Sequence, residues 1–323
     1  MNFLHQLNLY FRIETGHHFK NRLMQIKSNT FFQTILLFTV FVLSPLHSQS
    51  AKVYVSAHPD DWQLFMNPNA YHDLQNPENK VIFLHSTAGD AGSGTGNNSY
   101  YLAREEGSLR AIRFLCNANN NELKQGNNMN KMQVTINDHR LLRYSYGNAV
   151  VYFLRLPDGN INGAGFPLHD DKSLKKLYKE SIPSITAIDN SSQYHSLDDL
   201  ILTISEIITY EATDTEQVSF NIADTNTNIN PRDHSDHINS SLIMQKVAHH
   251  LGIKSVRLYQ EYTTSTKPIN VFEDDYLISA GTWGVTASGL SDHFHYSTWD
   301  DGHNAYIGRQ YFRDVLISDL EKE

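Results

Sequence analysis

The sequence predicts an α/β protein with a parallel or mostly parallel sheet. Two observations support this: apolar runs of strand length alternate with stretches of helical periodicity, and polar clusters follow several strands abruptly. The chain has 323 residues, enough for one large domain with a hydrophobic core. Residues 51–323 contain no long Pro/Ser linker and no internal repeat, so we expect a single domain.

Each predicted strand is an apolar run that ends in a polar or turn-forming segment. Valine, isoleucine and aromatic residues are frequent in these runs and favour extended structure. Pro59 marks the end of the first run, because proline cannot donate a hydrogen bond to a sheet ladder. The predicted strands are 53–55, 80–85, 149–156, 218–223 and 255–262.

Segments with helical periodicity separate these strands. In the segment 100–115, apolar residues recur on one face of a helix, and 197–211 is likewise amphipathic. A further helix is predicted over 238–251 and ends at Gly252, a residue typical of helix C-termini. The Asn-rich stretch 117–130 is predicted to be a loop.

The first fifty residues are predicted to be a secretory signal peptide with an N-terminal extension. A basic flank precedes the apolar run Ile35–Leu43, and small or polar residues follow as far as Ser50. We expect export to the periplasm or the exterior after cleavage near Ser50, with no stable membrane span in the mature chain. A retained membrane anchor and a buried helix are the alternatives, and the true start is Met1 or Met24.

Composition narrows the function classes. The formal net charge is −9, which does not support a basic surface for nucleic acid. Cys116 is the single cysteine, so neither a disulfide nor a thiolate zinc site can form within one chain. Cys116 follows apolar residues and is expected to be an ordinary buried side chain. Nothing in the sequence specifies the oligomeric state.

Two clusters of histidine and aspartate indicate a metal site. His58, Asp60 and Asp61 follow the first strand, and the second cluster, 233–237 (DHSDH), follows the fourth. Catalytic zinc takes about three ligands from His and carboxylate and keeps one position open. We expect His58, Asp61 and His237 to supply them. Two histidines without a thiolate favour zinc, or another divalent transition metal such as Fe²⁺, over calcium or magnesium.

The remaining residues of these clusters suggest a hydrolytic mechanism. Asp60 lies beside a ligand and could act as general base toward a metal-activated water. His234 could stabilise an oxyanion or protonate a departing amine, and Asp236 could orient one of the histidines. Either motif alone could be a turn or a helix start without chemistry. Their occurrence together, each after a predicted strand, favours a metal site.

Three further segments have alternative interpretations. The Gly-rich loop 87–96 could cradle a phosphate, but it lacks the Lys-Ser/Thr of a P-loop and is more simply a rim beside the site. Arg104 could be part of a solvated helix face, and Asp158 could be only a turn residue. The aromatic residues of 281–312 could line a sugar-binding surface or form a lid packed on the core.

These motifs resemble the LmbE-like, or PIG-L, family of zinc-dependent N-deacetylases that act on N-acetylglucosaminyl compounds. The resemblance rests on A-H-P-D-D at 57–61 and H-S-D-H at 234–237. It also includes T-A-G-D-A-G at 87–92, R-E-E at 104–106 and L-P-D-G at 156–159. It covers residues 52–262, and Trp62 stands where the family usually has glutamate.

The resemblance implies a Rossmann-like fold and a set of residue roles. His58, Asp61 and His237 would bind zinc, with Asp60 as general base and His234 assisting the tetrahedral intermediate. Arg104 and Asp158 would contact sugar hydroxyls or an attached group.

We therefore expect an exported, zinc-dependent hydrolase that removes acetyl from an N-acetylglucosamine-type sugar or its conjugate. The alternatives are a metal-dependent hydrolase of another amide or an ester, and a carbohydrate-binding protein on a former enzyme scaffold.

Overall fold

The computed structural model describes residues 50–320 except 97, 119–128, 214 and 216. Ser48–Glu323 forms one compact unit, and the predicted signal peptide lies outside the described residues. An eight-stranded sheet forms its centre. The strands, in spatial order, are β10 (Phe312–Leu316), β9 (Ser255–Tyr259), β8 (Gln217–Ala223), β1 (Ser50–Ser56), β2 (Asn79–Thr87), β5 (Ala149–Leu156), β4 (His139–Tyr146) and β3 (Asn130–Ile136).

The five central strands, β9 to β5 in that order, are parallel to one another, and the outer strands are antiparallel to their neighbours. The fold is therefore α/β with a mostly parallel sheet, as the sequence predicts. All residues of β5 are buried, because a parallel sheet is covered on both faces. A separate two-stranded sheet joins β6 (Ile185–Thr186) to β7 (Gln193–Tyr194).

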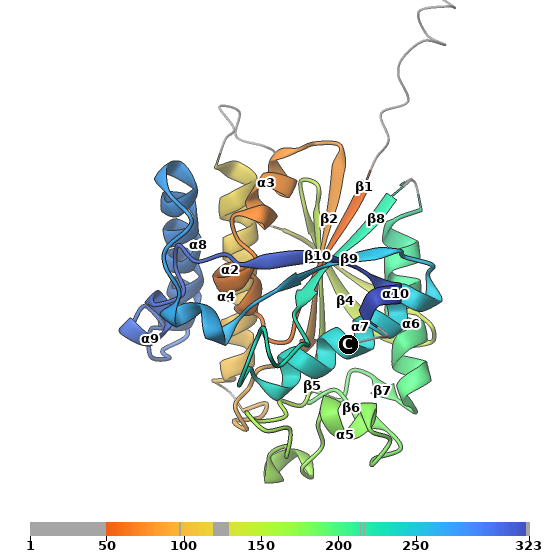
Figure 1. Cartoon of the computed structure of the whole chain (residues 1–323). Coiled ribbons are helices and arrows are strands. Elements are labelled where there is room, and N and C mark those ends of the chain that lie inside the picture. The colour runs from red at the N-terminus through yellow and green to blue at the C-terminus, as the bar shows by residue number, and fades with distance from the viewer. Residues whose placement is uncertain (1–49, 97, 119–128, 214, 216, 321–323) are drawn as a thin grey trace, which may run out of the picture. The chain divides into compact units, whose positions relative to one another are not determined.

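Helices cover both faces of the sheet (Figure 1). One apolar core lies under α2 (Asp61–Phe65), α3 (Asn69–Gln75), α4 (Tyr100–Asn117) and α8 (Glu273–Asp292). The other lies under α5 (Leu174–Tyr178), α6 (Leu197–Glu211), α7 (Ser235–His250) and α10 (Ile317–Leu320). A short helix, α9 (Asp301–Asn304), follows α8. No helix of the described part is both long and apolar enough to cross a membrane.

The observed elements differ from the predicted ones at a few boundaries. β5 and α6 have the predicted bounds, whereas α7 begins at Ser235, three residues before the predicted start. β9 ends at Tyr259, so Glu261 lies beyond the strand. Most of the predicted Asn-rich loop, 119–128, lies outside the described residues.

The strand order places a topological switch point between β1 and β8. The chain passes from β1 to β2 and β5 on one side, and then adds β8 and β9 on the other. Such a switch point leaves a gap at the carboxyl ends of the two neighbouring strands, where ligands bind in open α/β sheets. The segments that follow β1 and β8 therefore meet at this edge of the sheet.

The C-terminal segment is an integral part of the described fold. α8 packs along α4 at a very close approach, because a Cβ on Gly289 would lie 2.5 Å from the backbone nitrogen of Gly107. Trp283 of α8 is fully buried, and β10 pairs antiparallel with β9. Residues after the fifth predicted strand therefore cover one face and one edge of the sheet.

Candidate active site

The turn after β1 presents three polar side chains at the sheet edge. The Asp61 carboxylate accepts a hydrogen bond from the backbone N–H of His58 at 2.7 Å, which closes the turn on itself. Asp60 occupies the N-cap position of α2. All three residues are at most 5% exposed, although isolated charged side chains are rarely buried to this extent. The turn therefore depends on partners supplied by other segments.

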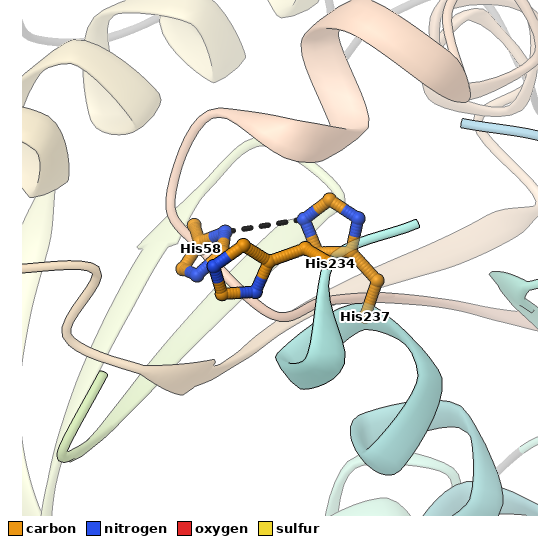
Figure 2. A group of neighbouring side chains, drawn as sticks. All are labelled: His58, His234 and His237. Carbon is orange, nitrogen blue, oxygen red and sulfur yellow. Dashed lines mark hydrogen bonds between the residues drawn. The ribbon is translucent and has the colours of Figure 1, made fainter. Parts of the chain in front are cut away.

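The start of α7 provides two imidazoles opposite this turn (Figure 2). His234 is the N-cap residue, and its Nδ1 accepts a hydrogen bond from the backbone N–H of Asp236 at 3.1 Å. That bond leaves the proton of a neutral His234 on Nε2. His237, one turn further along, faces His58, with the ring centroids 5.1 Å apart.

Three ligand atoms of the two clusters form a nearly equilateral triangle. His58 Nδ1 lies 3.4 Å from Asp61 Oδ1 and 3.2 Å from His237 Nε2. His237 Nε2 lies 3.3 Å from Asp61 Oδ1. Zinc bonds of about 2.0–2.2 Å in a tetrahedron place neighbouring ligand atoms about 3.4 Å apart. The triangle therefore has the dimensions of three corners of a tetrahedral zinc site.

Carboxylates stand behind both histidines of the triangle. His237 Nδ1 lies 2.9 Å from Asp233 Oδ1 and 2.5 Å from Glu261 Oε2. When the Nδ1 proton of His237 is shared with these carboxylates, Nε2 carries a lone pair that is directed at the triangle. His58 Nε2 lies 3.5 Å from Asp236 Oδ2. Histidines that bind metals commonly have a carboxylate at the second ring nitrogen, which fixes the tautomer.

Asp236 is held in place by the loop after β5. The backbone N–H of Gly159 donates to Asp236 Oδ2 at 2.8 Å. A Cβ on Gly159 would lie 2.3 Å from Asp236 Oδ1, so only glycine permits this approach. The L-P-D-G motif thus supports the histidine side of the site through a backbone contact.

The electrostatics of the cluster favour a positive charge at the triangle. Burial lowers the pKa of His58, but Asp61 and Asp236 outweigh it and raise that pKa to about 10. Burial also lowers the pKa of His237, but Asp61, Glu261 and Asp233 outweigh burial and raise that pKa well above its ordinary value. Burial raises the pKa of Asp61, yet His237 and His58 bring it well below its usual range.

A divalent cation fits this donor set. The carboxylates that favour imidazolium in the metal-free protein would equally favour a cation between the three ligand atoms. Ligand atoms of His58, His234 and His237 lie within 4.8 Å of one another. Other groups of this kind combine His58 or His237 with neighbouring carboxylates. Burial and the charges of the other two histidines lower the pKa of His234 to about 2, so its imidazole is neutral.

Asp60 is held from α4. Arg104 donates to Asp60 Oδ1 and, through its other terminal nitrogen, to the carbonyl of Gly89 at 2.5 Å. Arg104 is 9% exposed. Burial lowers the pKa of its guanidinium, but the charge of Asp60 outweighs burial and raises that pKa above its ordinary value. This ion pair fixes the Asp60 carboxylate beside the triangle.

A cavity of about 350 Å³ is lined by His58 and Asp61 of the triangle. His58, Asp60, Asp61 and Arg104 line it from the turn after β1 and from α4. The rest of its wall comes from α2, from the segment after β9 and from the C-terminal segment: Leu64, Phe65, Tyr262, Asp300, Gly302, His303 and Tyr306. The volume lies within the usual range for small-molecule sites.

The structure brings most of the predicted site residues together. The predicted ligands form the triangle, Asp60 and Arg104 border the cavity, and His234 is 4.7 Å from His58 between ring centroids. Asp158 is buried and accepts hydrogen bonds from the backbone N–H groups of Ala91 and Asn160.

Sequence reasoning missed Glu261. It offered the segment 281–312 only as a sugar-binding surface or a lid, without assigning a role to any single residue of it. The sequence predicts a strand over 255–262, and a residue inside a strand is not expected to reach a site at the edge of the sheet. The signal of Glu261 is positional, since Glu261 lies a few residues after the end of a parallel strand, as Asp60 does after β1.

Solved structures with a likeness to this chain include two deacetylases, and both likenesses are weak. No protein-family model matches the chain, and neither does any curated protein. N,N'-diacetylchitobiose deacetylase from Pyrococcus horikoshii, complexed with its inhibitor MPG, has a TM-score of 0.46 and 14% identity, covering 96% of this chain and 97% of that one. The zinc-inhibited form of teicoplanin deacetylase Orf2 has a TM-score of 0.39 and 14% identity, covering 74% and 85%. Likenesses this low carry no argument about function.

Proposed function

We propose that this protein is a metal-dependent hydrolase that removes the acetyl group from an N-acetylglucosamine-type amino sugar or its conjugate. The observation that carries the proposal is the triangle of His58 Nδ1, Asp61 Oδ1 and His237 Nε2, of which His58 and Asp61 line a cavity. The paired motifs in the sequence, which resemble those of N-deacetylases, support the substrate class. Zinc is the proposed metal, because the triangle suits tetrahedral coordination.

The protein's own residues have distinct parts in the proposed reaction. When bound, the metal supplies Lewis-acid chemistry that makes a water molecule acidic enough to lose a proton near neutral pH. Asp60, fixed by Arg104, accepts that proton as general base. His234, with its proton on Nε2, donates a hydrogen bond to the oxygen of the amide carbonyl as negative charge develops there.

The proposed location is outside the cytoplasm. The support is the signal-peptide pattern of the first fifty residues, with β1 beginning at Ser50, next to the proposed cleavage point. The N-terminal residue of the mature protein, determined by mass spectrometry, tests this part of the proposal.

Acetate release tests the activity. Purified protein should release acetate from N-acetylglucosamine compounds that are free, lipid-linked or polymeric. Removal of the metal with a chelator should abolish release, and added zinc should restore it. Simple esters and non-sugar amides serve as competing substrates.

The Asp60→Ala variant is the matched control. It should retain the metal, because Asp60 is not part of the triangle, and lose about 10²- to 10⁴-fold in turnover, the range typical of a general base. Undiminished acetate release from metal-free protein would refute the mechanism. Loss of the metal from Asp60→Ala would instead make Asp60 a ligand.

A further inference from the structure

The C-terminal segment borders the same cavity as the proposed metal ligands. Asp300, His303 and Tyr306 lie on the cavity wall together with His58 and Asp61. None of the three belongs to the motifs that indicate hydrolysis. They lie in and around α9, a four-residue helix that follows α8. The cavity therefore has two parts: the cluster proposed to be catalytic, and a separate wall that is available for substrate recognition.

His303 is oriented by contacts on two sides. Its Nδ1 lies 3.0 and 2.9 Å from the two carboxylate oxygens of Asp300. Its ring is stacked on Trp283 at a centroid distance of 5.5 Å and an interplanar angle of 22°. Trp283 is itself fixed, because it is fully buried and its Nε1 donates to the carbonyl of Thr298 at 3.1 Å. With Nδ1–H donated to Asp300, His303 Nε2 carries a lone pair.

The second nitrogen of His303 is available to a ligand. Within the described part of the chain, His303 Nε2 makes no hydrogen bond, and the side chain is 38% exposed. A partly exposed imidazole would ordinarily sample several rotamers, and the two contacts restrict them. An acceptor whose direction is set in advance binds a hydroxyl at a lower cost in entropy.

Aromatic rings form another part of the cavity wall. Tyr306 meets Phe65 edge-on at 5.0 Å and is stacked with Tyr262 at 6.0 Å and 25°. The cavity thus combines aromatic surface with polar groups at one edge. A pyranose ring has the matching character, since its C–H groups form an apolar face and its hydroxyls form a polar rim.

The wall and the catalytic turn share a rigid support. α8, which carries Trp283, packs on α4 through Gly107 and Gly289, and α4 carries Arg104. Arg104 in turn holds Asp60. The position of His303 relative to the general base is therefore set by the contact between two helices.

We propose that His303 is a specificity-determining residue whose Nε2 accepts a hydrogen bond from a ring hydroxyl of the sugar that carries the N-acetyl group. Asp300 and Trp283 position it, and Tyr306 packs against the sugar ring. This inference rests on the proposed function and adds to it that the cyclic sugar, and not the acetamide alone, is recognised.

The test compares a cyclic and an acyclic substrate. In His303→Ala, the KM for N-acetylglucosamine compounds should rise about 3- to 10-fold, the loss expected for one hydrogen bond, with kcat nearly unchanged. The KM for a small acyclic acetamide should not change. His303→Gln, which keeps an acceptor near the position of Nε2, should recover most of the affinity. His249→Ala, an exposed histidine of α7 that does not line the cavity, should behave as wild type.

Binding measured without turnover makes the test independent of activity. In the Asp60→Ala background, calorimetry with N-acetylglucosamine should give a Kd that His303→Ala weakens by the same factor. Unchanged KM and Kd in metal-loaded His303→Ala would overturn the inference and leave the proposed function intact. Sugar binding that depends on His303, without acetate release from metal-loaded wild type, would refute the function and retain the site. Absence of both binding and release would refute both.

Discussion

Asp60 owes its position to a single residue of another element. The Asp60 carboxylate is nearly buried close to His58 and Asp61, and Arg104 forms an ion pair with it. The same guanidinium is bonded to the carbonyl of Gly89, so it joins the turn after β1 to the loop after β2. Arg104 therefore has a positioning part in addition to the substrate contact that the sequence resemblance implies.

The Arg104→Ala substitution distinguishes the positioning of Asp60 from direct contact with the substrate. Loss of the ion pair should lower kcat by about 10- to 100-fold, since small misplacements of a reacting group have effects of this size. Metal content should be unchanged. Arg113→Ala is a matched control, because Arg113 lies on the same helix, pairs with Glu106 and does not line the cavity. A rise in KM with kcat unchanged would show that Arg104 acts through substrate binding alone.

At the residue level, the sequence predicted the side chains that follow strands and missed those that tertiary packing brings in. His58 and His237 were recognisable because each belongs to a short polar cluster after an apolar run. Glu261 has no such local signal, and His303 stood out only as part of the segment 281–312 that could line a sugar-binding surface. Glu261 reaches His237 only because β9 lies next to β8, and no sequence pattern specifies that neighbour.

Close packing of α4 against α8 sets the position of the cavity wall. The two helices meet at Gly107 and Gly289, and a Cβ on Gly107 would lie 2.6 Å from the carbonyl oxygen of Thr286. Glycine is unfavourable inside helices, so packing must compensate for its cost here. The sequence did not predict α8 as a helix, because its three glycines and two threonines lower the helix propensity of this segment.

Two substitutions in α8 test this packing. Gly289→Ala should lower the free energy of unfolding by about 1–3 kcal/mol, because its Cβ would meet the backbone of α4. Gly284→Ala should leave it unchanged or raise it by up to about 1 kcal/mol, since the nearest atom lies at an ordinary contact distance of 3.6 Å. Denaturant unfolding measures both. Equal effects of the two substitutions would contradict the close approach.

At the scale of the whole molecule, the parallel centre of the sheet was predictable and its margins were not. Among the parallel strands, β2 and β5 contain long apolar runs, because helices cover both of their faces. β3 is mostly exposed, β10 alternates between exposed and less exposed residues, and the two lie at the edges of the sheet. Their membership of the sheet depends on pairing with β4 and β9, which the local sequence does not determine.

Removal of residues 1–47 should leave the remaining fold intact. β1 begins at Ser50 and pairs on both sides within Ser48–Glu323, which forms one compact unit. The thermal midpoint of the shortened protein should stay within about 2 °C of that of the full chain, with the same metal content. Differential scanning calorimetry measures the midpoint. A fall of more than about 4 °C, roughly 1 kcal/mol or more, would show that residues 1–47 contribute to stability.

The strand order has a consequence for when the centre is assembled. His58 leaves the ribosome early, whereas its partner His237 is encoded 179 residues later, and Glu261 later still. A nascent polypeptide that ends before His237 therefore lacks one of the proposed ligands. If the protein is exported unfolded, as the proposed location implies, the metal would be loaded only after the chain has crossed the membrane, and the supply of metal there would set the active fraction.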